Sequence, residues 1–303
     1  MGFLYLLEKI RVSFLNEIML LITRFGEETA FLVVALIMFW CVDKKKGYFI
    51  LSVGFVGTIT SQLLKLMCRV PRPWIKDGNF TIVEQAREAA SGYSFPSGHS
   101  QSAVGTFGGI AAVIKKKWVR IAAITIAVLV PFSRMYLGVH TPQDVIVGSL
   151  ISLVLIIALK QIVFSDNKRT MPILLGVMTF LAFGYVCFVN LFPFPADIDQ
   201  HNLASGTQNA YRLLGALLGF LFVYITDEKW LHFPTKAIWW AQILKVLFGL
   251  ILVLAVKAGM KTPLNWLLGE SVGRSARYFL IVVVAGVVWP LTFRWFAKLN
   301  LKG

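Results

Sequence analysis

The sequence predicts an all-α, polytopic membrane helix bundle. Hydrophobic residues make up 57% of the 303 positions and charged residues only 15%, and the mean hydropathy is +0.72. Soluble globular domains are far less apolar than this. The apolar residues are gathered into runs about as long as a helix that crosses a bilayer, with short polar or basic segments between them. No segment is polar enough to form a separate soluble domain.

Residues 1–25 are expected to form one amphipathic helix along the membrane interface. Apolar side chains recur at helical spacing on one side, whereas Glu8, Lys9, Arg11 and Glu17 interrupt the other side. Gly26 then ends the segment. No basic stretch precedes the first apolar residues and no small-residue cleavage site follows them, so we do not expect a removable signal peptide.

A core of six helices is expected within residues 26–192. Its spans cover about residues 29–42, 47–67, 99–114, 118–133, 142–164 and 172–192. The first span is short for a hydrocarbon layer of about 30 Å, so we expect it to recruit part of the preceding segment. The pair Gly105 and Gly109 favours close helix contact, which places the third span near the centre of the bundle. Thr141 as N-cap and Pro142 at the first helical position start the fifth span.

Two further segments complete the predicted organisation. The connection at residues 69–95 is polar and too long for a simple turn, so we expect it to form a lid or wall of a site. Residues 193–303 are expected to add a three-helix membrane extension, with spans at about residues 204–226, 237–257 and 276–296. The role of this extension stays open between a lateral gate, a dimer interface and a second functional module.

The formal net charge of +15 is explained by membrane topology rather than by nucleic-acid binding, because the cations are scattered over short loops between spans. Compact lysine clusters at residues 44–46 and 115–117 lie on one side of the predicted bundle. By the positive-inside rule this side faces the cytoplasm, and the opposite loops face out. Cys41, Cys68 and Cys187 show no CxxC spacing and are interpreted as structural thiols.

Three polar clusters lie at the ends of predicted spans on the outward side. A lysine or arginine near the bilayer centre costs roughly 2.5–3.5 kcal/mol on insertion scales, so such residues are functional candidates. Together the clusters predict an anion pocket that contains a nucleophile. They consist of Lys65, Arg72 and Pro73; then Pro96, Ser97, Gly98 and His99; then Ser133, Arg134, His140 and Asp144.

Five of these residues are predicted to bind a phosphate. Ser97 and Gly98 open a helix, where N–H groups without helical partners favour an anion, and Gly98 allows its close approach. Arg72 and Arg134 supply planar donor forks that match phosphate oxygens, and Lys65 adds a compact charge. These cations would neutralise a transferring phosphoryl group. No acidic cluster is present to position Mg²⁺, so no metal and no cofactor are expected.

Three residues are predicted to carry the acid–base chemistry. His140 precedes Asp144 by four residues, so the carboxylate can accept a hydrogen bond from one ring nitrogen and present the other as a nucleophile. A phosphohistidine intermediate would form, and water would complete the second step. His99, at the start of the phosphate-binding helix, is suited to protonating the leaving oxygen.

The three clusters, in order and with these spacings, resemble the signature motifs of the type-2 phosphatidic acid phosphatase superfamily, in its membrane branch. The resemblance covers roughly residues 20–192, and the last hundred or so residues depart from its six-span pattern. It implies a six-helix core, metal-independent hydrolysis of a phosphomonoester or pyrophosphate, His140 as the nucleophile held by Asp144, and His99 as the acid. It also implies that Lys65, Arg72, Ser97, Gly98 and Arg134 surround the phosphate.

We therefore expect an integral membrane lipid phosphatase in a bacterial cytoplasmic (inner) membrane, with its active site facing the periplasm. Undecaprenyl pyrophosphate, phosphatidylglycerol phosphate and phosphatidate are the candidate substrates. A lipid phosphotransferase with the same intermediate is the alternative, and a non-catalytic phospholipid transporter or scaffold is a second. The expected partners are the lipid phosphate substrate and membrane lipids, with no nucleic acid; a homodimer stays open.

Overall fold

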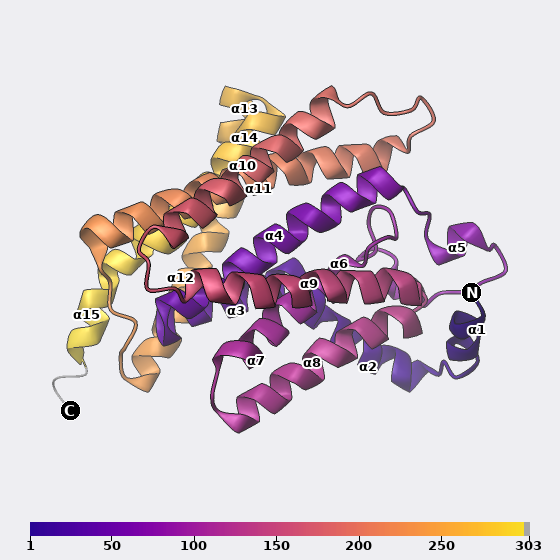
Figure 1. Cartoon of the computed structure of the whole chain (residues 1–303), viewed down its shortest axis with the longest axis horizontal. Helices are drawn as coiled ribbons and strands as arrows, with labels where there is room; N and C mark the ends of the chain where they lie inside the picture. The colour runs from indigo at the N-terminus through magenta and orange to yellow at the C-terminus, as the bar shows by residue number, and fades with distance from the viewer. Residues whose placement is uncertain (300–303) are drawn as a thin grey trace. The chain divides into compact units, whose positions relative to one another are not determined.

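The computed structural model describes residues 1–299, and these residues form helices and no strands (Figure 1). Within these residues, seven helices are long and apolar enough to cross a membrane, or up to eight if one bent pair counts as a span. This confirms the predicted fold class. The nine predicted spans correspond to these seven helices, to the bent pair and to one shorter helix that starts at Gly98.

The α-helices have the following bounds in chain order. They are α1 (Gly2–Lys9), α2 (Ser13–Thr23), α3 (Glu28–Ile37), α4 (Lys44–Cys68), α5 (Pro73–Lys76), α6 (Gly98–Ala103), α7 (Gly109–Val113), α8 (Lys117–Tyr136), α9 (Pro142–Val163), α10 (Thr170–Leu191), α11 (Gln200–Thr226), α12 (Trp239–Gly259), α13 (Lys261–Leu268), α14 (Glu270–Val283) and α15 (Phe293–Lys298). The short 3₁₀ and π segments include η1 (Arg24–Gly26), η2 (Met38–Val42) and η4 (Val104–Gly108).

Two compact units divide the chain. The first unit comprises Met1–Leu32, Ile50–Lys160 and Pro195–Gly206. The second unit comprises Val33–Phe49, Gln161–Phe194 and the chain from Thr207 onward. All of the predicted site residues belong to the first unit.

The N-terminal segment differs from the single helix expected at residues 1–25. It forms two helices, α1 and α2, and the backbone between them is extended at Val12. The break has a tertiary cause, because Arg11 donates from Nε to the carbonyl of Tyr136 (2.8 Å) and from Nη1 to that of Thr81 (2.7 Å). The segment Ser13–Gly26 is bent by 55° against the one that follows it, so the two form a broken span or a re-entrant pair.

The third core helix is short and central, as its small residues predict. It runs from α6 through the π segment η4 into α7. A Cβ atom on Gly105 would lie 3.2 Å from Oγ of Ser152 on α9 and 3.2 Å from Cγ1 of Val53 on α4. A side chain here would displace these two side chains by a few tenths of an ångström, so glycine favours the close approach of the three helices.

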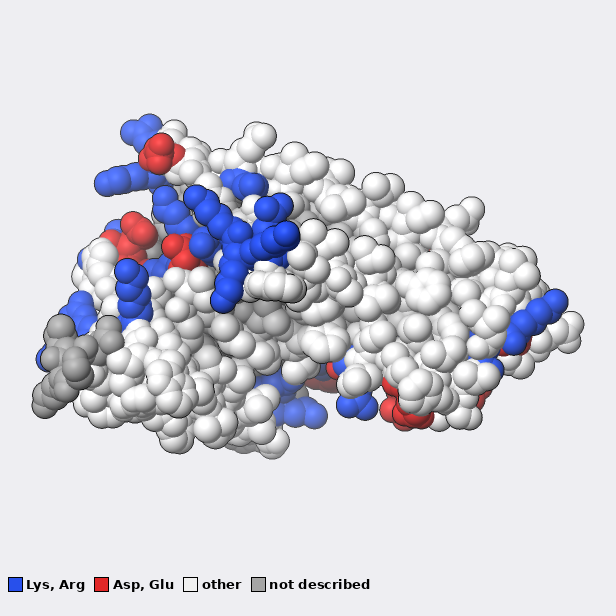
Figure 2. Space-filling view, turned by 90° about the horizontal axis from the view of Figure 1, so that it is seen from below, with Lys and Arg blue, Asp and Glu red and all other residues white. Residues whose placement is uncertain are grey.

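Large apolar side chains cover the outside of the spanning helices. Val154 and Ile157 on α9 and Phe180 on α10 are exposed by 63%, 66% and 72%, as expected of residues that contact lipid. Figure 2 shows the Lys and Arg side chains of one face in separate groups, with broad uncharged surface between them. Trp118, at the start of α8, is 77% exposed and suits the interface level of a bilayer.

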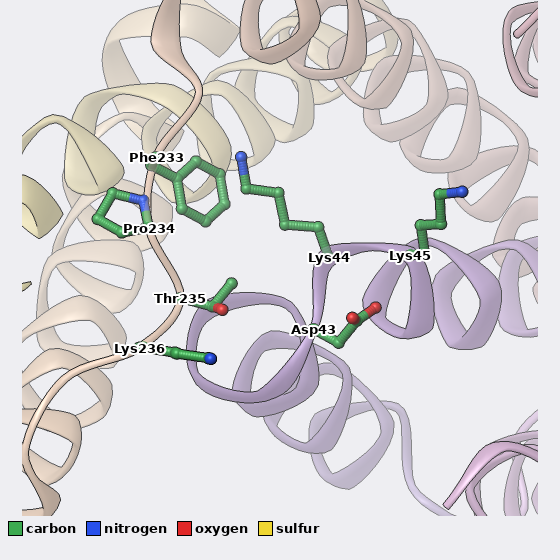
Figure 3. Close-up of a pocket in the computed structure, with 7 residues that line it drawn as sticks. All are labelled: Asp43, Lys44, Lys45, Phe233, Pro234, Thr235 and Lys236. Carbon is green, nitrogen blue, oxygen red and sulfur yellow. The ribbon is translucent and has the colours of Figure 1, made fainter.

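The second unit contains a buried lysine and an open pocket. Lys245 on α12 is fully buried and donates to the carbonyls of Trp40 (2.9 Å) and Thr235 (3.0 Å). Nearby, Nζ of Lys44 donates to both oxygens of Asp227 at 2.8 and 2.7 Å and lies 3.8 Å from the ring centre of Phe233. The pocket of about 510 Å³ beside this pair is lined by Asp43, Lys44, Lys45, Phe233, Pro234, Thr235 and Lys236 (Figure 3).

Candidate active site

The first unit brings the predicted residues into one buried cluster. Side chains from the end of α4, the N-cap of α5, the start of α6, the end of α8 and the start of α9 with the turn before it all contribute to it. Lys65, Arg72, Arg134, His140 and Asp144 are each at most 6% exposed. His99 is in electrostatic range of the cations and of the second imidazole. Residues up to 79 positions apart in sequence therefore surround one small volume, as the motif order predicts.

Asp144 holds the turn that carries His140. Its Oδ2 atom accepts from the backbone N–H of Thr141 (2.7 Å), while the Thr141 hydroxyl accepts from the N–H of Asp144 (3.3 Å). This reciprocal pair is a capping box at the start of α9. The hydroxyl of Ser94 donates to the same Oδ2 atom (2.6 Å). Two donors, the N–H of Thr141 and the hydroxyl of Ser94, thus fix the carboxylate independently of the imidazole.

The His140 imidazole lies between Asp144 and Arg72. Nδ1 is 3.5 Å from Oδ2 of Asp144, which is an electrostatic contact rather than a well-formed hydrogen bond. On the other side, Nε2 lies 2.9 Å from Nη1 of Arg72. Because a guanidinium can only donate, Nε2 carries the lone pair and Nδ1 carries the proton in the neutral ring. The nitrogen that faces the cations is therefore the one that carries the lone pair.

Burial lowers the pKa of the His140 imidazole well below its usual range, and the neighbouring cations, Arg72 first among them, lower the pKa further. Both effects disfavour the charged imidazolium. The neutral form, with a lone pair available for attack, is the one that this environment favours.

Arg72 and Lys65 are held by the loop that precedes the second motif. Arg72 donates to the carbonyls of Gly92 (3.0 Å), Ser91 (2.7 Å) and Val139 (3.0 Å). Lys65 donates to the carbonyl of Tyr93 in the same loop. The connection at residues 69–95 thus forms a wall of the site. A wall is one of the two roles, lid or wall, that the sequence predicts for it. A phosphate oxygen would compete with these neutral carbonyls for the same cationic donors.

The start of α6 leaves room for an anion. Ser97 is the N-cap, and its Oγ atom accepts from the N–H (3.3 Å) and the hydroxyl (2.9 Å) of Ser100. The Ser97 N–H donates to the carbonyl of Asp144 (2.9 Å), so it is not available to a ligand. A Cβ atom on Gly98 would meet nothing within 4 Å. The open space beside Gly98, together with the first-turn N–H groups, fits a phosphate.

Arg134 shows the clearest signature of an anion site. Its side chain is completely buried, and its Nη1 atom donates to Oγ1 of Thr23 (2.8 Å). Nε and Nη2 are buried too, yet no group of the described residues accepts from them. Nε2 of His99 is likewise buried and has no hydrogen-bond partner among the described residues. Buried donors of this kind each cost about 1–3 kcal/mol when unsatisfied, so a ligand with several acceptor oxygens fits here.

Two residues of the site were not found from the sequence. Ser94 supports Asp144, and Thr23 supports Arg134. Ser94 lies only two positions before Pro96, so its nearness to the second motif was a usable signal. Thr23 ends an amphipathic segment 111 positions before its partner, and no local pattern marks it. No group of three or more His, Cys, Asp and Glu side chains within the described part of the chain could hold a metal ion.

Two family models match the chain. The PAP2 superfamily matches residues 45–168, which contain all eight predicted site residues. A second match, to the PAP2 superfamily phosphatase transmembrane extension, covers residues 211–302. The C-terminal helices, which depart from the six-span pattern of the motif resemblance, therefore have counterparts in other phosphatases of this superfamily. No solved structure gives a significant match.

Three curated proteins are similar to the chain. Undecaprenyl-diphosphatase of Sulfolobus acidocaldarius is 31% identical over 143 residues, which cover 46% of this chain and 67% of the relative. Phosphatidylglycerophosphatase B of Bacillus subtilis is 35% identical over 164 residues, or 50% of this chain and 76% of the relative. Undecaprenyl-diphosphatase BcrC of Bacillus subtilis is 29% identical over 159 residues, or 52% and 78%. With these matches and its apolar helices, the chain belongs to the PAP2 superfamily and is an integral membrane lipid phosphatase.

Proposed function

We propose that the protein hydrolyses a lipid phosphomonoester or pyrophosphate, without a metal ion, through a phosphohistidine at His140. The observation that carries this proposal is the buried guanidinium of Arg134, whose Nε and Nη2 donors have no acceptor among the described residues. They lie in a cluster with two imidazoles and two further cations. Such a cluster provides charge for a phosphoryl group and a nitrogen nucleophile to attack it.

In the first step the phosphoryl oxygens bind Arg72, Arg134 and Lys65. Arg72 then turns its Nη1 donor from Nε2 of His140 toward an oxygen, and the ring lone pair becomes free. The negative charge of the bound phosphate favours the imidazolium form of His99. Nε2 attacks phosphorus, the bond from phosphorus to the leaving oxygen breaks, and this imidazolium gives its proton to that oxygen and becomes neutral. Asp144 stabilises the positive charge that the ring of His140 acquires.

In the second step a water molecule attacks the phosphohistidine. His99, now neutral, takes a proton from the water as the new oxygen–phosphorus bond forms and the nitrogen–phosphorus bond breaks. Inorganic phosphate leaves, and His140 returns to its neutral form. The cations stabilise the negative charge on the phosphoryl oxygens in both steps, which is the part that a metal ion plays in other phosphatases.

The proposed substrates are undecaprenyl pyrophosphate, phosphatidylglycerol phosphate and phosphatidate. The first two agree with the activities in the names of the relatives. The head group enters from the outer face, while the lipid tail stays in the bilayer. The basic loops on the opposite side support a cytoplasmic membrane location with the site facing the periplasm. Labelling of single cysteines placed at Asn79 and Lys116 with an impermeant reagent tests this orientation, because only position 79 is expected to react in intact cells.

A lipid phosphotransferase would use the same phosphohistidine, with an alcohol in place of water. Product analysis separates the two reactions, because hydrolysis releases inorganic phosphate and leaves no phosphorylated acceptor. A transporter or scaffold would need the cations but not the pair of His140 and Asp144. The buried contact between these two side chains favours an enzyme.

The decisive experiment is a phosphate-release assay on the three candidate lipids in detergent micelles. His140→Asn is expected to abolish release, because an amide cannot form the phosphohistidine. His232→Asn is the matched control: His232 is exposed, lies in the second unit and has a φ of 44°, a conformation that Asn tolerates. This variant is expected to keep full activity. Activity retained in His140→Asn, or no release from any of the three lipids by the wild-type protein, would refute the proposal.

A further inference from the structure

The N-terminal segment reaches the proposed phosphate pocket through a single hydroxyl. We infer that Thr23 is a positioning residue that orients the guanidinium of Arg134 toward the transferring phosphoryl group. The inference rests on the proposed function, in which Arg134 binds the phosphate. It adds to the machinery a residue that lies outside the family match at residues 45–168.

The contact itself is short and buried. Thr23 is the last residue of α2 and is 4% exposed. Its Oγ1 atom accepts a hydrogen bond of 2.8 Å from Nη1 of Arg134, which is fully buried near the end of α8. A bond from a charged donor in such surroundings is stronger than one between neutral groups. Its removal should therefore be measurable.

The effect of this hydrogen bond depends on which nitrogen of the Arg134 guanidinium donates it. In a guanidinium, the Nε–H and one Nη2–H point to the same side and form a fork that can bind two oxygens of one phosphate. These two nitrogens of Arg134 are the buried ones without an acceptor. Thr23 holds the remaining nitrogen, Nη1. Because the group is planar, fixing Nη1 also fixes the direction of the fork.

The segment that carries Thr23 is held firmly against the site. Three residues later, a Cβ atom on Gly26 would lie 2.9 Å from the carbonyl oxygen of His99 and 2.7 Å from Cγ1 of Val130. The turn η1 therefore packs directly on the backbone of the second motif. At the other end of α2, Oδ1 of Asn16 accepts from the hydroxyl of Tyr136 (3.1 Å), two residues after Arg134. The segment that presents the Thr23 hydroxyl to Arg134 is therefore in contact with the site region at both of its ends.

Thr23→Val replaces the hydroxyl by a methyl group of similar size and removes the acceptor. We expect kcat/KM to fall about ten- to one-hundredfold, since a hydrogen bond to a charged group contributes about that factor. The affinity for vanadate, which mimics the pentacoordinate phosphoryl group, is expected to fall by a similar factor. Thr23→Ser keeps the acceptor and is expected to restore both values to within about threefold of the wild type.

A matched control and a double variant separate positioning from a loss of structure. Thr58→Val removes a hydroxyl that bonds only within its own helix, to the carbonyl of Gly54 (2.8 Å), and should leave both values unchanged. In an Arg134→Lys background, Thr23→Val is expected to have little further effect, because lysine has no fork to orient. Thr23→Ala serves in place of Thr23→Val if the valine variant unfolds at the assay temperature.

Three results would overturn the inference: wild-type vanadate affinity in a folded Thr23→Val or Thr23→Ala variant, failure of Thr23→Ser to restore it, or effects of Thr23→Val and Arg134→Lys that simply add. A failure of the proposed function itself would be seen in different measurements. It would appear as phosphate release by His140→Asn, or as no release by the wild-type protein, whatever the Thr23 variants do.

Discussion

Asp144→Asn removes the carboxylate charge that faces His140 and keeps the size of the side chain. At the 3.5 Å separation of Nδ1 and Oδ2, a unit charge on the ring and one on the carboxylate attract by roughly 5 kcal/mol at an effective dielectric of about 20. This attraction exists in full only when the ring becomes positive, as it does on forming the phosphohistidine. It corresponds to an upper limit of roughly three thousandfold in rate.

Asparagine can retain one acceptor for the N–H of Thr141 and for the hydroxyl of Ser94, so part of the local structure should persist. We therefore expect kcat to fall about 10²- to 10³-fold, with a much smaller change in KM. The assay is phosphate release from lipid micelles, combined with quenching in base, where a phosphohistidine survives, and in acid, where it hydrolyses, to follow the intermediate. Slower formation of the intermediate is the expected cause.

Asp43→Asn provides the matched control for this variant. Asp43 also caps a helix start, because its Oδ1 atom accepts from the N–H of Lys46 (3.0 Å), but it lies in the second unit, whereas the candidate site lies in the first. Its replacement should leave kcat unchanged. This expectation is refuted if Asp144→Asn keeps more than about a tenth of the wild-type kcat, because the lost stabilisation is then below about 1.4 kcal/mol, or if Asp43→Asn loses as much activity.

Three more outcomes are expected. The acid limb of the pH profile of kcat/KM should lie below pH 6.5, because the lowered pKa of His140 keeps the ring neutral until the pH falls through that lowered value; a limb at or above pH 6.5 would contradict this. Gly148→Ala should lower kcat/KM about 10- to 100-fold, since its Cβ would lie 2.5 Å from the carbonyl oxygen of Ser97, whereas Gly184→Ala, with nothing within 4 Å, should not. Hydrolysis should persist in excess EDTA and be inhibited by vanadate, and a requirement for Mg²⁺ would exclude the proposed pocket.

Spacing within the sequence was enough to locate the helices and the motif residues. Apolar runs predict spans because a helix can bury its backbone hydrogen bonds within itself, which is a local property. Thr141 and Pro142 predict the start of α9 for the same reason, and α9 begins at Pro142. The nearness of His140 to Asp144 follows from a four-residue separation at that helix start. The spans, the start of α9 and the spacing of His140 and Asp144 are all local properties and do not depend on which helices are in contact.

The partners of the site residues depend on packing between distant segments. The division of the N-terminal segment into α1 and α2 follows from hydrogen bonds of Arg11 to carbonyls 70 and 125 positions away. Likewise, the backbone carbonyls that hold Arg72 and Lys65 come from a loop with no sequence motif.

The sequence by itself determined the membrane-helix class and indicated the ionisable groups of the candidate site, because local hydrophobicity and motif spacing encode both. Only the tertiary structure decided how those groups are oriented: that Arg134 is held at Nη1 by Thr23, and that Arg72 lies against Nε2 of His140. The physical reason is that a hydrogen bond depends on distance and direction within fractions of an ångström. Such precision arises from the packing of whole helices and leaves no trace in residue spacing.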